Sequence, residues 1–464
     1  MLKKLLDYLE NKKILILGYG MEGESSYKFL RNHFLEKKLF IADKNMNLLN
    51  SKIELVEDPY VEVSLGENYL NGIEEYDLIL KAPGISLKDV DISKFENKII
   101  SQLQLFLEFM DVYTIGVTGT KGKSTTSSLI YKVLEEQGKD TFLLGNIGEP
   151  IFNDIDYIKK DSIVVLELSS HALEYVTKSP NISVLLDIFE EHLDHYKSFE
   201  KYVEAKFNVA KFQKTSDFLI YNYDNEAMKE YGFKYRENDY AVSLQVKPET
   251  KNNAFLENDI IYCNNKEMMN IHEKMNLKGL HNINNIMFVL SVCDILNLDI
   301  AKAVDSIKNF KTLEHRMEFV GILNGVEYYN DSIATIPEAT MNAINALKNV
   351  NTVIVGGNDR GVDLSELINF LRDNKELENI ICLPKTGEYI KEGLEGADKS
   401  VWFIENLEDA VNKAMQVTKK GKACLLSPAA SSYGYFKNFE ERGKLFKKYV
   451  LEGASSEFGF RKNN

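Results

Sequence analysis

The sequence predicts an α/β protein with parallel sheets, divided into three domains. Short apolar runs alternate with stretches of helical period, which is the pattern of strands and helices that build parallel sheets. The chain has 464 residues, a length typical of about three domains. Two breaks in the alternation place these domains at residues 1–112, 113–314 and 315–464.

In the first domain, a short amphipathic helix is expected before the first strand. Strands are expected at Lys13–Leu17, Lys38–Ala42 and Asp77–Lys81, with a helix at Glu24–Glu36 between the first two. The helix-like segment Ser93–Asp111 then leads into a second glycine-rich motif. This segment marks the first boundary.

The second domain continues the alternation and then loses it. Strands are expected at Tyr113–Val117, Ile163–Leu168, Ser183–Ile188 and Phe218–Tyr221. The polar stretch Tyr231–Asn276 lacks the alternation, so we expect it to form a small β insertion.

A β hairpin is expected to open the third domain. The segment FVGILNGVEYYN turns at Asn324-Gly325, a dipeptide that favours a two-residue hairpin turn. Later apolar runs alternate with helical segments and predict a parallel sheet. These runs are Thr352–Val355, Asn379–Leu383, Val401–Ile404 and Ala423–Leu426.

The composition favours small molecules as partners. The 56 Lys and Arg against 70 Asp and Glu give a net charge of −14, which argues against nucleic acid. The cysteines Cys263, Cys293, Cys382 and Cys424 lie far apart, so neither a disulfide framework nor a zinc site is expected. No run approaches the roughly 18–20 apolar residues of a membrane span. We expect a cytoplasmic protein and a monomer.

The first candidate site is the loop Gly18–Gly23, a G-x-G-x-x-G that follows a strand and opens a helix. Such glycines allow the backbone to approach a diphosphate at a helix N-terminus. Asp43, at the end of the next strand, could accept a hydrogen bond from a ribose hydroxyl. The pattern indicates a nucleotide site but does not separate NAD from a UDP-sugar, and glycine-rich turns also occur in doubly wound sheets without this role.

The second candidate site is the loop Gly116–Thr125, again between a strand and a helix. Backbone N–H groups of such a loop surround phosphate oxygens, while Lys123 can reach the phosphates and Ser124 can bind Mg²⁺. A strict P-loop has glycine where Val117 stands, so the sequence is a variant, G-T-x-G-K-S. We expect it to bind phosphate.

Acidic and histidine residues follow the next two strands. Glu167 ends a strand, a position suited to a further Mg²⁺ contact. The segment Glu190–His195 could also bind metal, although such clusters are often an exposed helix start. Taken by itself, Lys206 would be interpreted as a surface lysine.

Several motifs together resemble the Mur ligase family, in order and spacing over essentially the whole chain. They are G-T-K-G-K-S-T, E-L-S-S, E-H-L-D-H-Y, the Lys206 helix, G-L-H-N-I-N-N, L-E-H-R-M-E, Y-N-D-S-I-A-T, and S-P-A-A-S-S-Y followed by F-K-N-F-E-E-R-G. The last pair is especially similar to members that add glutamate. The resemblance implies a Rossmann-like domain for a UDP-sugar, a central P-loop ATPase domain and a Rossmann-like domain for the incoming amino acid.

The resemblance also implies ATP and two Mg²⁺ ions as cofactors. Lys123, His192 and Lys206 would be catalytic, with Lys206 carbamylated so that it offers an oxygen ligand. Ser124 and Glu167 would hold one Mg²⁺, and His192 and Lys206 the other. The residues implied to bind the nucleotide are Gly119, Thr120, Lys121, Gly122, Lys123, Ser124, Thr125, Asn282, Asn285, Arg316 and Asp331.

The implied substrates are UDP-N-acetylmuramoyl-L-alanine and D-glutamate, joined through an acyl phosphate in cytoplasmic peptidoglycan precursor synthesis. The D configuration rests on the resemblance alone. The implied UDP-sugar contacts are Gly20, Met21, Asp43, Gly84 and Asn146. The implied glutamate contacts are Thr335, Arg360, Ser432, Tyr433 and Phe439.

Two positions depart from the family pattern. Ile333 stands where members often have Lys, so a cation that would help to hold phosphate is missing. Arg360 stands where many members have Lys, and an arginine still offers a bidentate fork to a carboxylate.

Three other classes of protein explain part of the pattern. A nicotinamide oxidoreductase would use Gly18–Gly23 and Asp43 but would leave the second loop without a role. A P-loop switch protein would use that loop but neither outer domain. Folylpolyglutamate synthetase shares the G-T-x-G-K-S loop but lacks an N-terminal UDP-sugar domain, which makes it the weaker ligase alternative.

Overall fold

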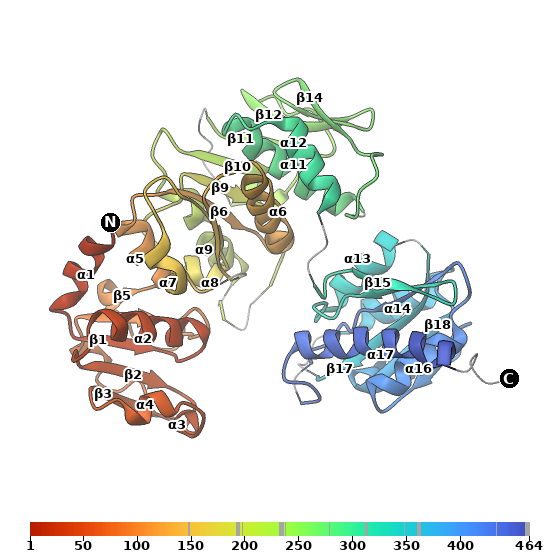
Figure 1. Ribbon diagram of the computed structural model, residues 1–464, viewed down its shortest axis with the longest axis horizontal. Helices are drawn as coiled ribbons and strands as arrows, with labels where there is room; N and C mark the ends of the chain where they lie inside the picture. The colour runs from red at the N-terminus through yellow and green to blue at the C-terminus, as the bar shows by residue number, and fades with distance from the viewer. Residues whose placement is uncertain are drawn as a thin grey trace. The chain divides into compact units, whose positions relative to one another are not determined.

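The computed structural model describes residues 1–146, 149–191, 195–196, 198–231, 236, 238–277, 279–310, 314–347, 349–359, 363–432 and 434–459. The chain forms two compact units: unit 1 (Met1–Lys274 with His281–Phe310) and unit 2 (Met275–Leu280 with Lys311–Asn464). Unit 1 contains two sheets and unit 2 contains one, and helices alternate with their largely parallel strands (Figure 1). The predicted α/β class is therefore confirmed.

The first sheet of unit 1 has the order β3-β2-β1-β4-β5, and every neighbouring pair is parallel. Its strands are β1 (Ile14–Leu17), β2 (Leu39–Asp43), β3 (Val61–Leu65), β4 (Leu78–Lys81) and β5 (Ile99–Ile100). Because β1 is central and covered on both faces, it is the unbroken apolar run ILIL. The edge strand β3 alternates half-buried and exposed residues instead.

Helices and short turns cover this sheet. They are α1 (Leu2–Glu10), α2 (Met21–His33), α3 (Leu48–Ser51), α4 (Ile53–Glu57), α5 (Gln102–Phe109), η1 (Ile73–Glu75) and η2 (Glu96–Lys98). The expected amphipathic helix is α1, whose Leu5 and Leu9 lie one turn apart and are buried. They belong to the same core cluster as Ile14 and Ile16 of β1.

The second sheet of unit 1 has the order β14-β13-β12-β11-β10-β9-β6-β8-β7. Its strands are β6 (Tyr113–Thr118), β7 (Thr141–Gly145), β8 (Ile163–Glu167), β9 (Ile182–Leu185), β10 (Phe218–Asn222), β11 (Tyr240–Ser243), β12 (Asn252–Glu257), β13 (Ile260–Cys263) and β14 (Lys266–Asn270). Its helices are α6 (Lys123–Glu136), α7 (Ile151–Asp154), α8 (Ser170–Leu173), α9 (Phe199–Lys211), α10 (Glu226–Glu230), α11 (Leu280–Ile295), α12 (Ile300–Asn309) and η3 (Ile155–Tyr157).

The segment expected to be a small β insertion does form strands, but these strands extend the central sheet and do not form a separate one. Strand β11 pairs in parallel with β10, and β12 pairs in parallel with β11. Only β13 and β14 are antiparallel. The edge of β10 presents N–H and C=O groups that need partners, and the polar segment supplies them although it lacks an apolar alternation.

The two sheets of unit 1 share one continuous hydrophobic core. Phe29 of α2 and Phe152 of α7 lie with ring centroids 4.5 Å apart. The buried Gln102 of α5 donates to the Glu22 carbonyl at 2.9 Å and accepts from Phe152 N at 3.3 Å. Because apolar packing and hydrogen bonds cross between the sheets, they form one compact unit, and the boundary expected after residue 112 stays a prediction.

The sheet of unit 2 has the order β15-β16-β20-β17-β18-β19. Its strands are β15 (Glu318–Leu323), β16 (Val326–Asn330), β17 (Val350–Gly357), β18 (Asn379–Lys385), β19 (Ser400–Phe403) and β20 (Ala423–Leu426). Only the β15–β16 pair is antiparallel. The predicted turn is confirmed, since Asn324 and Gly325 have φ values of +54° and +81°.

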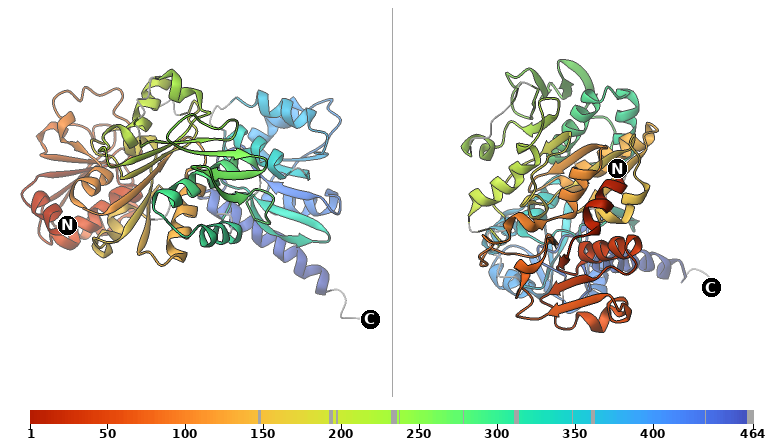
Figure 2. Two further views of the ribbon diagram at one scale, coloured as in Figure 1. Left: turned by 90° about the horizontal axis from the view of Figure 1, so that it is seen from above. Right: turned by 90° about the vertical axis from the view of Figure 1, so that its left-hand side faces the viewer.

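Helices cover both faces of this sheet. They are α13 (Pro337–Leu347), α14 (Ser365–Asp373), α15 (Thr386–Gly393), α16 (Leu407–Val417) and α17 (Phe439–Gly459). Val353 of β17 packs in the cluster with α13, α14 and α15, whereas its neighbour Ile354 packs with α16 and α17. Helix α17 continues past the sheet towards the C-terminus (Figure 2). In the described part of the chain, no helix is both long enough and apolar enough to cross a membrane.

Candidate active site

The loop between β6 and α6 has the backbone that a phosphate-binding loop requires. Gly119 and Gly122 have φ values of +152° and +85°. A Cβ atom on Gly122 would lie 2.5 Å from Asn285 Oδ1, and one on Gly119 would lie 2.7 Å from Leu186 Cβ. Only glycine fits either position, and the helix N-terminus that follows favours an anion. The loop therefore suits phosphate, as predicted.

The backbone N–H and the hydroxyl of Thr120, in the same loop, both form hydrogen bonds within the protein. Its N–H donates to the Asp187 carbonyl at 2.6 Å. Its hydroxyl lies 2.9 Å from Tyr202 Oη and 3.1 Å from the Phe189 carbonyl. Thr120 thus anchors the loop to the segment after β9 and to helix α9, while its predicted contact with the nucleotide stays a prediction.

Two lysines from different helices converge on one carbonyl oxygen of the loop. Lys123 Nζ donates to the Gly119 carbonyl at 2.9 Å and to the Thr120 carbonyl at 2.8 Å. Lys206 Nζ donates to the same Gly119 carbonyl at 2.7 Å. Lys206 is only 1% exposed, so its interpretation as a surface lysine is wrong. The amphipathic helix α9 turns it inward, one turn after the buried Tyr202.

The environment of Lys206 favours a neutral amine. Burial and the neighbouring Lys123 hold the pKa of Lys206 well below its usual value, although Glu191 opposes this shift. A low-dielectric site penalises the charged form, and a second cation adds repulsion. An unprotonated amine is the form that can react with CO₂.

Glu167 ends β8 beside the loop and is 1% exposed. Asn146 Nδ2 donates to its Oε1 at 2.8 Å, whereas the Ser127 hydroxyl, 3.5 Å from its Oε2, donates to the Lys123 carbonyl at 2.9 Å. The Asn146 amide therefore holds the carboxylate. The side chain of Asn146 supports Glu167, and its predicted contact with the sugar-peptide stays a prediction.

The described metal candidates are Ser124, Glu167 and Lys206, whereas the predicted ligand His192 lies outside the described residues. No group of three His, Cys, Asp or Glu side chains suited to a metal occurs within the described ranges. A hydroxyl and a carboxylate are nevertheless the oxygen donors that Mg²⁺ prefers. These donors fit Mg²⁺ held jointly with the phosphates of a nucleotide.

Helix α11 brings the predicted adenine residues against the phosphate loop. Asn282 and Asn285 are both buried, and Asn285 Nδ2 donates to Asn282 Oδ1 at 3.2 Å. Asn284 Nδ2 lies 3.5 Å from Asp187 Oδ2, which links the helix to the carboxyl end of β9. Residues far apart in the sequence thus lie beside the phosphate loop.

The first glycine loop follows β1, as predicted. A Cβ on Gly23 would lie 2.0 Å from the Gly18 carbonyl oxygen, whereas Gly20 has open space around it. Asp43 Oδ2 accepts from Tyr19 N at 2.7 Å, so this carboxylate holds the loop. The predicted Met21 is 82% exposed, and Gly84 also faces open space. The open space at Gly20 and Gly84 lets a ligand approach the loop.

A polar link that the sequence did not indicate joins the two sheets of unit 1. Lys81, at the end of β4, is 4% exposed, and its Nζ lies 3.6 Å from Glu174 Oε2. His195 Nε2 lies 3.3 Å from the same oxygen, and its ring packs edge-on against His171. The sequence signal for this link was Lys81 at the end of the apolar run of β4. A lysine buried there needs an acidic partner, because lysine is rarely buried unpaired.

In unit 2, Arg316 and Asp331 lie on adjoining loops. Asp331 Oδ1 accepts from Met317 N at 3.1 Å, and Asp331 Oδ2 accepts from Ser427 Oγ at 2.8 Å. Burial raises the pKa of Asp331 to about 7, although these hydrogen bonds and Arg316 oppose the shift. Arg316 Nε is buried and has no hydrogen-bond partner among the described residues.

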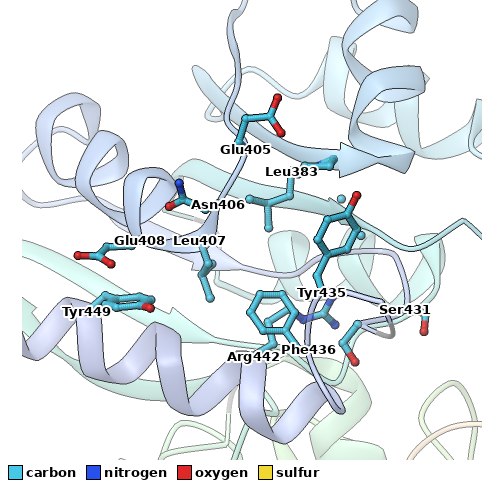
Figure 3. A pocket seen from close by; sticks show the side chains of 14 residues that line it. Leu383, Glu405, Asn406, Leu407, Glu408, Ser431, Tyr435, Phe436, Arg442 and Tyr449 are labelled. Atoms are coloured by element: carbon cyan, nitrogen blue, oxygen red, sulfur yellow. The ribbon is translucent and has the colours of Figure 1, made fainter.

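A pocket of about 250 Å³ opens at the carboxyl edge of the sheet of unit 2 (Figure 3). Strand β17 has β20 on one side and β18, followed by β19, on the other, so the order of the strands reverses beside β17. Parallel sheets usually bind ligands at such a switch point. Arg442 and Phe436 lie opposite Glu405 in the close view. The lining residues are Gly356, Gly357, Leu383, Pro384, Glu405, Asn406, Leu407, Glu408, Ser431, Ser432, Tyr435, Phe436, Arg442 and Tyr449.

The predicted glutamate residues are only partly brought together. Ser432 lines this pocket, whereas Thr335 and Phe439 do not. The Phe439 carbonyl accepts from Ser332 Oγ at 2.8 Å, and its ring packs edge-on against His315. Arg360 and Tyr433 lie outside the described residues.

Arg442 is the buried residue that the sequence interpretation missed in this unit. It is fully buried, and its guanidinium donates to Ser332 Oγ, Ser332 O and Ala430 O at 3.0, 2.8 and 3.1 Å. It therefore ties the Y-N-D-S loop to the S-P-A-A-S-S loop. The E-E-R-G sequence was the only signal, and an arginine in a helix is ordinarily interpreted as exposed.

Comparisons with known proteins agree with this arrangement of loops. Residues 117–293 match the Mur ligase middle domain, and residues 315–430 match the glutamate ligase domain of Mur ligases. The UDP-N-acetylmuramate–alanine ligase of Thermotoga maritima covers 96% of this chain and all of its own, with a TM-score of 0.60 at 15% identity, which shows the fold alone. The MurF ligase of the same organism, solved with ADP, has a TM-score of 0.57 at 16% identity, covering 96% and 97% of the two chains.

The chain belongs to the Mur ligase family. Among its curated relatives is the UDP-N-acetylmuramoylalanine–D-glutamate ligase of Caldanaerobacter subterraneus, 32% identical over 96% of this chain and 99% of the relative. The enzyme of that name from Acetivibrio thermocellus is 33% identical over 96% of this chain and 98% of the relative. The resemblance derived from the motifs is thus confirmed.

Proposed function

We propose that this chain is an ATP-dependent, ADP-forming ligase that joins D-glutamate to UDP-N-acetylmuramoyl-L-alanine in peptidoglycan precursor synthesis. The substrates follow the names of relatives that align over 96% of the chain. The observation that carries the chemistry is the convergence of Lys123 and the buried Lys206 on the glycine-rich loop.

The reaction requires activation, because joining a carboxylate to an amine is unfavourable in water. The γ-phosphoryl group of ATP transfers to the alanine carboxylate, giving an acyl phosphate and ADP. The amine of glutamate then attacks the carbonyl carbon, phosphate leaves, and the amine loses a proton. Lys123 offsets the repulsion between the carboxylate and the phosphate, which is electrostatic and positional catalysis.

Two Mg²⁺ ions, when bound, would neutralise charge on the phosphate oxygens. Ser124 and Glu167 would hold one of them, and His192 with carbamylated Lys206 the other. The lowered pKa of Lys206 supports the carbamate, because CO₂ adds only to the neutral amine. A carbamate would also replace a possible cation beside Lys123 with an anion.

The remaining binding roles follow the division of the chain into domains at 112 and 314. Residues 1–112 would bind the UDP-sugar at Gly20, Met21, Asp43 and Gly84, with Asn146 near the sugar-peptide. Residues 113–314 would bind ATP, with Arg316 and Asp331 also reaching the nucleotide, and the other binding residues of 315–464 would hold the amino acid. Thr335, Arg360, Ser432, Tyr433 and Phe439 would form the glutamate site.

An ADP-release assay with the purified chain tests this function. We expect ADP only when UDP-N-acetylmuramoyl-L-alanine and D-glutamate are both present, and little with L-glutamate or D-aspartate. ADP formation with a folate substrate in place of the sugar nucleotide would support the folylpolyglutamate synthetase alternative. Tight binding of NAD without ADP release would support the oxidoreductase.

We also propose a cytoplasmic monomer. The four free, buried cysteines support a reducing compartment. Light scattering after size-exclusion chromatography should give a mass near 53.1 kDa. A mass near twice that value would contradict the monomer.

A further inference from the structure

Arg316 is presented by a turn of unusual backbone conformation. Its neighbours His315 and Met317 have φ values of +65° and +44°. Residues with side chains rarely adopt this left-handed region, so bonds from outside the turn must hold it. Strand β15 begins directly afterwards, at Glu318.

Several such bonds are present. His315 N donates to Glu318 Oε2 at 2.9 Å, and Ile333 N donates to the His315 carbonyl at 3.1 Å. Met317 N donates to Asp331 at 3.1 Å. These bonds fix the backbone of the turn but not the ring of His315.

The ring is held by Asn330, which ends β16 and is fully buried. Asn330 Nδ2 lies 2.8 Å from His315 Nδ1, 2.9 Å from Glu318 Oε2 and 3.3 Å from the Gly443 carbonyl. Its Oδ1 accepts from Ser332 N at 3.2 Å. Because an amide nitrogen can only donate, a neutral His315 ring accepts this bond at Nδ1 and carries its proton on Nε2.

Helix α17 admits this ring only because residue 443 is glycine. A Cβ there would lie 2.1 Å from His315 Nδ1. Asn330 and the α17 backbone at Gly443 therefore both lie against the Nδ1 edge of the ring. The acidic and basic groups around it are Glu314, Glu318, Glu440 and Lys447, and burial lowers the pKa of His315, which favours the neutral ring that can accept.

We propose that Asn330 is a positioning residue for the nucleotide: its amide holds the His315 ring and thereby adds a side-chain restraint to the left-handed turn, already held by backbone bonds, that presents Arg316. The inference rests on the proposed function, in which Arg316 reaches the nucleotide. Asn330 itself touches no substrate in this account. Its loss should weaken ATP binding and leave the UDP-sugar site, in unit 1, unchanged.

The substitution Asn330→Asp removes the amide donor and places a carboxylate beside Glu318. The new side chain has the same shape and can still accept from Ser332 N, but it cannot donate to a neutral His315. We expect the Kd for ATP, measured by calorimetry on the full chain, to rise at least tenfold. The affinity for the UDP-sugar should change less than twofold.

Lys447→Met is the matched control for simple destabilisation. Lys447 Nζ lies 2.7 Å from Glu318 Oε1 and 2.9 Å from Glu314 Oε1, on the outer side of the same network. Its removal should lower Tm yet leave ATP affinity unchanged. An equal loss of ATP affinity in Lys447→Met would assign the effect to stability and overturn the proposal.

A second pair keeps the test independent of how well Asn330→Asp folds. In His315→Gln the side-chain oxygen can still accept from Asn330, whereas His315→Leu has no acceptor. We expect ATP affinity to be largely retained in the first and lost in the second. Equal affinities in the two variants, or wild-type affinity in Asn330→Asp, would overturn the positioning role.

The experiment distinguishes a wrong proposed function from a wrong role for Asn330. A wild-type chain that binds ATP but releases no ADP with both substrates would remove the ligase reaction. The variants would still report on Asn330, because their readout is nucleotide affinity rather than turnover.

Discussion

At the scale of single residues, the chemistry depends on titratable groups whose charged forms the surrounding protein disfavours. Lys123 and Lys206 share one carbonyl oxygen, and Asp331 keeps a carboxylate where burial disfavours its charge. Such groups cost stability in the free protein. Their position at the predicted nucleotide site is consistent with use of that energy when ligands bind.

Lys206→Ala should be almost inactive and partly rescued by short carboxylic acids. The substitution removes the amine that would form the carbamate, and a small carboxylate can enter the space left beside the loop. The measurement is ADP release with and without added acetate or formate. Lys211→Ala on the same helix is the control, because that lysine is exposed and should keep normal activity. Normal turnover of Lys206→Ala would end its role in the mechanism.

Asp331→Asn should stabilise the protein at pH 8 while lowering activity. The folded-state pKa of Asp331 is about 7 against an ordinary value of 3.8. A raised pKa gives stability that is present below about 3.8 and is lost as the pH rises through 7, at about 1.4 kcal/mol per unit. The amide removes this loss, so thermal unfolding should show a higher Tm for the variant at pH 8.

The sign of the pH dependence is the check on this prediction. The difference in Tm should shrink as the pH falls and should vanish near pH 4. A constant difference from pH 4 to pH 8 would show that Asp331 is not the titrating group.

At the scale of elements, the glycines at the two ends of α6 differ in the room around them. Gly122 and Gly138 both have positive φ, at +85° and +75°, and they stand at opposite ends of α6. A Cβ on Gly138 would meet nothing within 4 Å, whereas one on Gly122 would meet Asn285 at 2.5 Å. An alanine at either position strains the backbone, but only an alanine at Gly122 also disturbs the ligand site. Comparing the two variants therefore distinguishes the two effects.

Gly122→Ala should lose ATP affinity at least tenfold, because the new methyl group displaces Asn285 and blocks the cradle. Gly138→Ala should lose only about 1 kcal/mol of unfolding free energy from the left-handed backbone. Calorimetric titration with ATP and urea unfolding measure the two quantities. If both variants bound ATP like the wild type, the loop would not be a close-fitting phosphate site.

At the scale of the whole molecule, two compact units predict more than one unfolding transition. Scanning calorimetry should resolve a transition for each unit, since each has its own core. Added UDP-sugar should shift the transition of unit 1 to higher temperature. At one hundred times its Kd, the ligand adds about 2.7 kcal/mol to the free energy of unfolding of that unit. A single transition would show that the units unfold together.

The sequence alone was sufficient for the α/β class, most of the buried strands and both glycine loops. These follow from local rules: apolar runs such as ILIL at β1, and glycines where a strand turns into a helix. The short strands β3, β5 and β7 were not predicted. Of these, the edge strand β3 shows only half-buried or exposed residues, and β5 has two residues, too few to show a period.

Only the tertiary structure decided which side chains meet. Lys206 becomes buried on the phosphate loop because helix α9 packs against it, and Asn285 fills the space beside Gly122 because α11 returns from far along the chain. Arg442 and Asn330 are polar residues whose partners lie on other elements. Burial and long-range hydrogen bonds depend on the whole packing, and no local pattern of the sequence encodes them.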